Sequence, residues 1–191
     1  MEAGTTAQGV RERGDAQGSS GTVVAEGQAP GIVAGLGQTF TRGVTAGLFA
    51  GLLFVLAQMG WAVERLEKPA VAPFLDMSTV FNNTDVPAVT PENVVIGLIT
   101  HLSLSMVFGI VFALLFVPLL RRTPLLIAGG LAFGLLLYVV NIQILGRFIF
   151  EWFTNPNGPP QIFEIFVHAL FGLLLVPFFI GAAQRVRAPA A

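Results

Sequence analysis

The sequence contains no cysteine and few charged side chains. Without cysteine the chain cannot form disulfides, thiolate metal sites or cysteine-ligated iron-sulfur clusters. Charged residues make up 11% of the 191 residues, and 10 Lys and Arg nearly balance 11 Asp and Glu. Because no basic run extends beyond Arg121 and Arg122, we expect no nucleic-acid partner.

Common enzyme motifs are also missing. No glycine-rich phosphate loop stands between a strand and a helix, and no Gly-x-Ser-x-Gly nucleophile elbow occurs. Ser103 and Ser105 follow His101 closely, but a helix sets them on different faces and no third partner is specified. We therefore predict that the protein is not an enzyme.

Hydrophobic residues, by contrast, make up 54% of the chain, and 17 of them are Phe. A mean hydropathy of +0.76 is typical of integral membrane proteins. Four apolar stretches are long enough to cross a hydrocarbon core of about 30 Å at about 1.5 Å per residue. They cover residues 42–63, 93–119, 124–146 and 161–182. The predicted fold is an all-α, up-and-down bundle of four transmembrane helices, with the lipid bilayer as its first partner.

The segments outside these stretches define the predicted domain organisation. Residues 1–39 are rich in Gly, Ala, Gln, Thr and Ser without apolar periodicity, so we expect a disordered tail. The transmembrane domain spans 40–184, and a short tail covers 185–191. Three of the helices begin with entry signals, namely Thr90-Pro91-Glu92, Thr123-Pro124 and Pro159-Pro160. The very short turn 121–123 predicts that the helices it joins are antiparallel neighbours.

The distribution of basic residues predicts the orientation. Lys and Arg concentrate on the cytoplasmic side of membrane proteins. Arg11, Arg13, Arg42, Arg121, Arg122, Arg185 and Arg187 fall on one side, and Arg65, Lys68 and Arg147 fall on the other. Both termini are therefore predicted to be cytoplasmic, and loops 64–92 and 147–160 face outward.

Apolar side chains in these two outer loops suggest contact with the membrane surface. In the first loop, Phe74, Leu75, Met77, Val80 and Phe81 suit a short interfacial helix. In the second, Phe148, Phe150, Trp152 and Phe153 form an aromatic cluster suited to the headgroup boundary.

The only two histidines, His101 and His168, lie inside apolar helices. Counted from the outer helix ends, they are about 11 and 9 Å deep, which is level within one helical turn. An ionisable residue inside a bilayer is a candidate functional residue. Gln58 and Asn141 lie about 8 Å deep by the same count, and Glu164 is one turn from His168. The inner half of the bundle has almost no strongly polar side chain.

Small residues share faces with these polar positions. Gly97, His101, Ser105 and Gly109 recur every four residues, as do Glu164, His168 and Gly172. Similar stripes, Gly43-Gly47-Gly51 and Gly130-Gly134-Tyr138, lead towards Gln58 and Asn141. Small residues allow close helix contact in membranes, so we expect the four stripes to meet in the bundle interior. The sequence predicts a polar cavity, open to the outer face and lined by Gln58, His101, Ser105, Asn141, Glu164 and His168.

Three interpretations of this cavity remain open. In the first, it binds a proton, an ion or a small solute, and the protein is a carrier or an accessory subunit. In the second, His101 and His168 are the axial ligands of haem b between parallel helices. In the third, His101, His168 and Glu164 bind a metal ion such as zinc. The sequence is compatible both with a larger membrane complex and with a homo-oligomer.

Short motifs within residues 42–180 also suggest a family. Thr100-His101 followed by Ser105 and Phe108, and Glu164-Ile165-Phe166-Val167-His168, resemble the corresponding stretches of the YagU-like inner-membrane proteins, as does the Gly60-Trp61 neighbourhood. The resemblance implies four helices in a bacterial inner membrane and implies no activity. The chain departs from the family pattern at Gln58, where a charged residue is expected, and it lacks the Pro-Pro-Arg that follows the first helix there.

Overall fold

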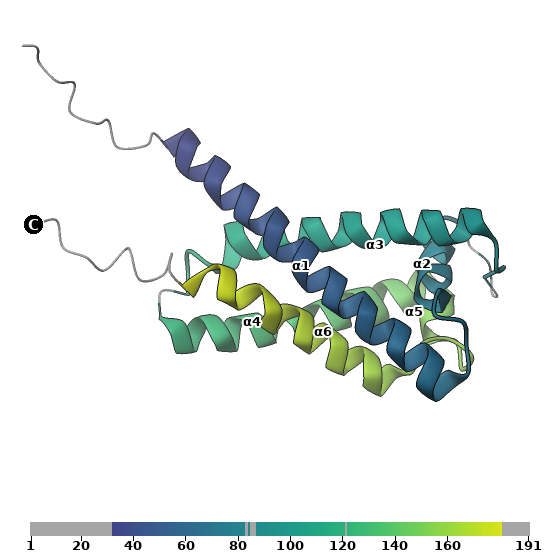
Figure 1. Cartoon of the computed structure of the whole chain (residues 1–191). Coiled ribbons are helices and arrows are strands. Elements are labelled where there is room, and N and C mark those ends of the chain that lie inside the picture. The colour runs from purple at the N-terminus through teal and green to yellow at the C-terminus, as the bar shows by residue number, and fades with distance from the viewer. Residues whose placement is uncertain (1–31, 83, 85–86, 121, 181–191) are drawn as a thin grey trace, which may run out of the picture.

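Four long helices lie side by side in one bundle (Figure 1). The computed structural model describes residues 32–82, 84, 87–120 and 122–180, and the secondary structure in this part of the chain is entirely helical. Its elements are α1 Ile32–Leu66, α2 Ala72–Asn82, α3 Pro91–Val111, the π-helix η1 Phe112–Phe116, α4 Thr123–Tyr138, the π-helix η2 Val139–Leu145, α5 Gly146–Phe148, the 3-10 helix η3 Glu151–Thr154, α6 Gln161–Leu175 and the 3-10 helix η4 Val176–Phe178. The all-α prediction is confirmed for the described residues.

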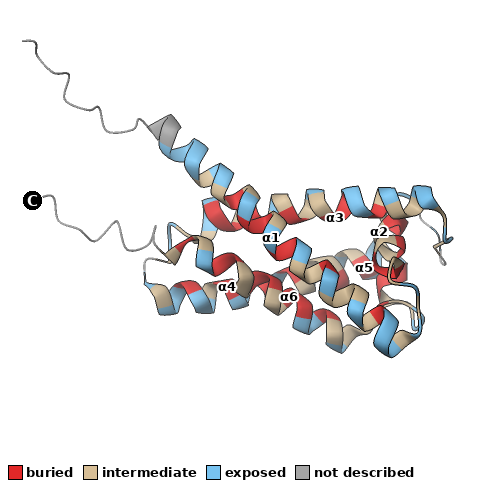
Figure 2. Cartoon of the chain, viewed as in Figure 1, coloured by how far each residue is buried: buried red, intermediate tan, exposed pale blue. Residues whose placement is uncertain are grey.

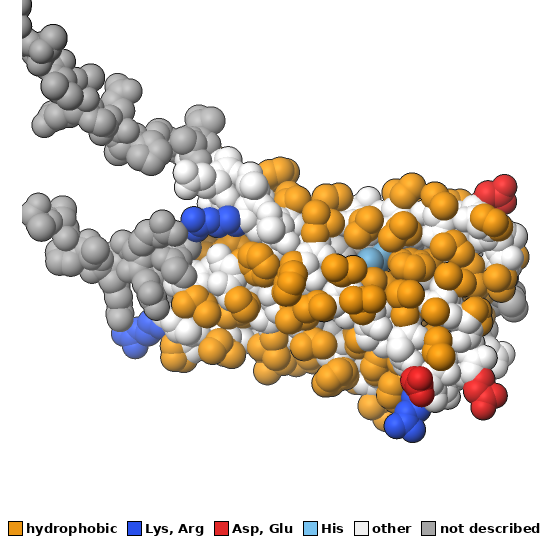
Figure 3. Space-filling model, viewed as in Figure 1, with side chains coloured by type: hydrophobic (Ala, Val, Ile, Leu, Met, Phe, Trp, Pro, Cys, Tyr) orange, Lys and Arg blue, Asp and Glu red, His pale blue; other side chains and the backbone are white. Residues whose placement is uncertain are grey.

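Four helical runs are long and apolar enough to cross a membrane. They are Gly35–Leu66, Pro91–Phe116, Thr123–Phe148 and Gln161–Phe178, which correspond to the four predicted stretches. Hydrophobic side chains cover the middle of the face seen in Figure 3, and charged side chains gather at its two ends. Large apolar side chains such as Leu115 and Ile162 are 61% and 85% exposed. This pattern is compatible with a multi-pass helical membrane protein.

The first helix begins earlier than predicted. It starts at Ile32 rather than at residue 42, so the prediction of disorder is wrong for residues 32–39. The hydroxyls of Thr39 and Thr41 donate to the carbonyls of Gly35 and Gly37 one turn earlier. These bonds accommodate polar side chains on a helix that the sequence pattern does not predict. Residues 1–31 of the predicted tail, and the tail 185–191, lie outside the described residues.

The predicted helix entries at Thr90 and Pro124 are confirmed. Thr90 has extended backbone and accepts a hydrogen bond from the Asn93 backbone N–H at 3.2 Å. Pro91 and Pro124 occupy first-turn positions of α3 and α4, where a missing N–H leaves no helical bond unmade.

Glycine contacts organise the four helices into two pairs. The main partner of α1 is α3, and the main partner of α4 is α6. A Cβ atom on Gly47 would meet the carbonyl oxygen of Ser105, and a Cβ atom on Gly134 would meet that of His168. The glycines of the predicted stripes thus meet two by two, α1 with α3 and α4 with α6, rather than all four together. Helices α3 and α4 run antiparallel, as predicted (Figure 1). They are not each other's main partners, because α3 packs mainly on α1 and α4 packs mainly on α6.

An aromatic cluster closes the space between the pairs at the end where α3 leads into α4. The Phe112 ring lies 5.3 Å from Phe133 and 5.7 Å from Phe179, measured between centroids. All three side chains are at most 2% exposed. Buried residues lie on the facing sides of the helices in Figure 2. The polar side chains described below are therefore confined to the opposite half of the bundle.

Replacing Gly134 by Ala should destabilise the protein by about 1 to 3 kcal/mol, because the added methyl group forces α4 away from α6. Thermal unfolding in detergent, followed by circular dichroism, measures this effect. Gly60→Ala is the matched control, since no atom lies within 4 Å of a Cβ at that helical position. Its expected effect is neutral or stabilising, because Ala favours helix. Equal losses of stability in the two variants would contradict the pairing described here.

Candidate functional site

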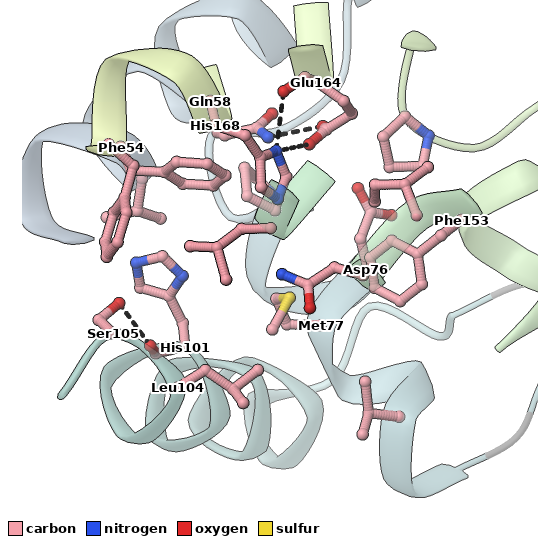
Figure 4. A pocket seen from close by; sticks show the side chains of 18 of the residues that line it. Phe54, Gln58, Asp76, Met77, His101, Leu104, Ser105, Phe153, Glu164 and His168 are labelled. Atoms are coloured by element: carbon pink, nitrogen blue, oxygen red, sulfur yellow. Dashed lines mark hydrogen bonds and ion pairs between the residues drawn. The ribbon is translucent and has the colours of Figure 1, made fainter. Parts of the chain in front are cut away.

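A cavity of about 310 Å³ lies between the two helix pairs. Among the described residues, seven polar and fourteen apolar residues line it, and none of these is Lys or Arg. All six residues predicted from the sequence are on its wall, together with Asp76. The polar lining residues are Gln58, Asp76, His101, Ser105, Asn141, Glu164 and His168. The structure therefore brings residues of α1, α2, α3, η2 and α6 to one site (Figure 4).

His101 is held on α3 by the close contact with α1. Its side chain is 7% exposed, and ring Nε2 lies 2.8 Å from the backbone carbonyl oxygen of Gly51. A carbonyl oxygen can only accept, so Nε2 carries the proton and donates it. Ser105, one turn later, donates its hydroxyl to the His101 carbonyl at 2.7 Å. The absence of a side chain at Gly51 gives room to the Ser105 side chain, which a Cβ atom at this position would meet.

His168 on α6 bonds to the backbone through ring nitrogen Nδ1, whereas His101 bonds through Nε2. Its Nδ1 donates to the backbone carbonyl of Glu164 at 2.8 Å, and the Glu164 Oε2 atom lies 3.5 Å from the same nitrogen. The other carboxylate oxygen, Oε1, accepts from Gln58 Nε2 at 2.6 Å, which ties α6 to α1. The predicted Glu164–His168 neighbourhood is thus present, but the short bond runs to the Glu164 backbone.

One aromatic ring contacts both imidazoles. The Phe54 ring centroid lies 5.7 Å from His101 and 5.1 Å from His168. Both histidines therefore lie at the level of a single α1 side chain. Tyr138 also contacts the His168 ring, at 6.0 Å between centroids.

The arrangement does not fit a bis-histidine haem. Such a site needs both imidazoles to direct a nitrogen at one iron with a flat macrocycle between them. Here the Phe54 ring packs against both imidazoles, and Nε2 of His101 is already bonded to Gly51. Among the described residues, no three His, Asp or Glu side chains are grouped so that they would hold a metal ion. The haem and metal interpretations stay predictions without geometric support.

The segments 64–92 and 147–160 contribute residues to the cavity wall rather than leaving a wide polar mouth. Helix α2 packs on α3 and contributes Pro73, Met77 and Val80 to the cavity wall. The predicted short helix therefore forms, with one face against the bundle. From the second loop, Phe153 is 9% exposed and lines the cavity, whereas Phe148 is 80% exposed. The predicted aromatic cluster is thus divided between the interior and the surface.

Polar contacts join these two loops. The Trp152 indole N–H donates to Asp76 Oδ1 at 2.7 Å. The Lys68 ammonium donates to the Asn157 carbonyl at 3.0 Å and lies 5.9 Å from the Trp152 ring centroid. Burial raises the pKa of Asp76 above its ordinary value, although the Trp152 hydrogen bond and the Lys68 charge act in the opposite direction.

Several polar atoms on the cavity wall have no hydrogen-bond partner within the described residues. They are Nδ1 of His101, Nε2 of His168, Oδ2 of Asp76 and the side-chain amide of Asn141. None is sealed in the interior, because Trp61 Nε1 is the one such fully buried atom in the described part of the chain. Buried polar groups almost always bond to protein, water or a ligand. Water or a ligand inside the cavity would supply the missing partners of these atoms.

Sequence reasoning missed Asp76 and the π-helical turns. A signal for Asp76 existed, since Pro73, Asp76, Met77 and Val80 share one face at helical spacing. The turn η2, which carries Asn141, has no comparable signal. It widens the helix between Tyr138 and Gly146, and such turns are frequent at functional sites.

Asp76→Asn should change the pH dependence of stability. Because the folded state raises the Asp76 pKa, the stability that this group contributes is complete below the unfolded pKa of about 3.9 and is lost as pH rises through the folded pKa. The variant keeps an acceptor for Trp152 but cannot ionise. Its Tm relative to the unmodified protein should therefore rise between about pH 4 and pH 8, measured by differential scanning fluorimetry.

Glu151→Gln, at an exposed position of η3, removes a carboxylate outside the cavity and serves as the control. A Tm difference for Asp76→Asn that is constant with pH would show that burial of Asp76 does not influence its ionisation.

Comparison of the chain with protein-family models, curated proteins and solved structures gives no match. The resemblance to YagU-like proteins therefore rests on the sequence motifs given above. Inferences about function rest on the geometry of the cavity between the two helix pairs.

Proposed function

We propose that this chain is a small multi-pass protein of a bacterial inner membrane that binds a small solute in its cavity, as a carrier or an accessory subunit. The observation that carries this proposal is the set of unpartnered polar atoms on the wall of one 310 Å³ cavity. That volume falls within the range of small-molecule sites.

The hydroxyl and imidazole groups of the cavity favour binding over catalysis. Within the described part of the chain, Ser105 is the one hydroxyl-bearing residue that lines the cavity, and it donates its proton to the backbone carbonyl of His101. Activation of a serine nucleophile requires a hydrogen bond to a base such as a ring nitrogen. The arrangement therefore supports a non-enzymatic role.

The structure makes a single-cysteine experiment straightforward, because the natural chain contains no cysteine. Cysteine at Asn141 should react with methyl methanethiosulfonate at least about tenfold faster than cysteine at Leu126, since thiol reactivity follows exposure. Asn141 lines the cavity, whereas Leu126 is 0% exposed in the core. The rates are measured by mass spectrometry of the purified full chain in detergent. Equal, slow labelling at both positions would show that the cavity does not admit solutes.

The proposed orientation places the cavity end outside the cytoplasm and both termini inside. Basic residues support it, since the first part of α1, which contains Arg42, and the start of α4, where Arg122 is the N-cap, lie at the opposite end from α2. In intact bacterial cells, a membrane-impermeant maleimide should label cysteine at Asn157, in the loop beside η3. Cysteine at Arg122, in the α3–α4 connection, should react only after permeabilisation. The reverse pattern would place the cavity end in the cytoplasm.

A further inference from the structure

The polar groups of the cavity offer hydrogen-bond acceptors from several directions. The backbone bonds to Gly51 and Glu164 use the ring N–H of each neutral histidine, which leaves a lone pair on His101 Nδ1 and another on His168 Nε2. Asp76 adds an oxygen from α2 that accepts no bond within the described residues. A ligand that satisfies this wall must bring N–H or O–H donors.

The charged groups on the wall are of one type. Asp76 and Glu164 are both carboxyl groups, and the lining includes no Lys or Arg. As whole residues, Glu164 is 3% exposed and both histidines are less than 8% exposed. A buried carboxylate is stabilised by a nearby cation. An anionic ligand would be repelled by the carboxylates, and no Lys or Arg side chain on the described wall would offset that repulsion.

The remainder of the wall is apolar and rich in aromatic rings. Phe54 and Phe108 contribute rings from α1 and α3, and Phe153 contributes one from the outer loop (Figure 4). Aromatic faces attract cations and apolar groups alike. In Figure 3 part of a histidine is visible between hydrophobic side chains of this face, although both histidines are buried. The acceptors of the cavity thus lie within an apolar environment.

A bare metal ion matches this wall poorly. The described residues contain no group of three His, Asp or Glu side chains that would hold one. Fourteen of the twenty-one lining residues are apolar, which suits a ligand that is itself mostly apolar. The acceptors come from separate elements, so they suit donors that are spread over a molecular head group.

We propose that the ligand of this cavity is a small amphiphilic organic ammonium compound, with N–H donors on a cationic head and an apolar body. This inference rests on the proposed solute-binding function. Asp76 and Glu164 balance the charge, the two imidazole lone pairs accept from the head, and the aromatic rings surround the body. The pocket thereby selects for charge sign and for amphiphilic shape.

Three probes with the same phenyl group and similar length test the charge selection. They are 2-phenylethylammonium, neutral 2-phenylethanol and anionic 3-phenylpropionate, titrated calorimetrically into the purified full chain in detergent. The ammonium probe should bind at least about tenfold more tightly than the alcohol, because charge-assisted hydrogen bonds are stronger than neutral ones. The anion should bind weakest. Absent binding of the ammonium probe, or equal binding of the alcohol, would overturn the inference.

Isosteric variants test which groups recognise the head. Asp76→Asn and Glu164→Gln should each weaken ammonium binding at least about tenfold while leaving alcohol binding within about twofold. Glu151→Gln, at an exposed position outside the cavity, should leave both affinities unchanged. Equal losses in all three variants would indicate a general charge effect and would contradict the proposed site.

The labelling of cysteine at Asn141 separates the two proposals. If that cysteine reacts quickly and the three probes show no preference for charge, the cavity admits solutes and only the ammonium inference is wrong. If it reacts as slowly as cysteine at Leu126, solute binding itself is wrong. The ranking of the three probes uses the unmodified protein, so it does not depend on the folding of any variant.

Discussion

The structure depends on close backbone contact at glycines within two helix pairs. Gly47 and Gly109 bring α1 against α3, and Gly134 and Gly172 bring α4 against α6. In a lipid environment, apolar side chains gain little by leaving lipid for protein, so close packing supplies much of the helix association. The same contacts also place backbone carbonyls near the site. The Gly51 carbonyl bonds to His101, and the missing side chain of Gly51 leaves room for Ser105 on α3.

Because each pair is tight, the space that remains lies between the pairs. Bulky aromatic residues, including Phe112 and Phe133, fill one half of that space. The other half contains the cavity, which is lined by seven polar residues together with apolar and aromatic side chains. The resulting segregation gives the bundle a sealed end and a polar end. Helix α2 and the segment around η3 then cover the polar end through the Asp76–Trp152 hydrogen bond.

The histidines illustrate how backbone bonds prepare a site. Each ring gives its one proton to a main-chain carbonyl, which fixes the tautomer and holds the other nitrogen as an acceptor. Side-chain partners would allow more rotation than these backbone bonds do. A wall of acceptors, two carboxyl groups and several aromatic rings is the chemical basis for the proposed selection of organic cations.

The sequence by itself determined the helices and most of the site. The length of the apolar stretches predicted the four long helices. A spacing of four residues placed His101 on one face with Ser105, and Glu164 on one face with His168. Both signals are local, because they depend only on the helical repeat. Tertiary structure decided the rest. The pairing of the glycine stripes depends on which helix faces come into contact. Local sequence patterns do not determine that contact. Helix α2 brought Asp76 to the cavity wall because this helix packs on α3. The partners of each ring nitrogen were likewise decided by contacts between residues as far apart as Gly51 and His101, because a carbonyl becomes a partner only when packing brings it within bonding distance.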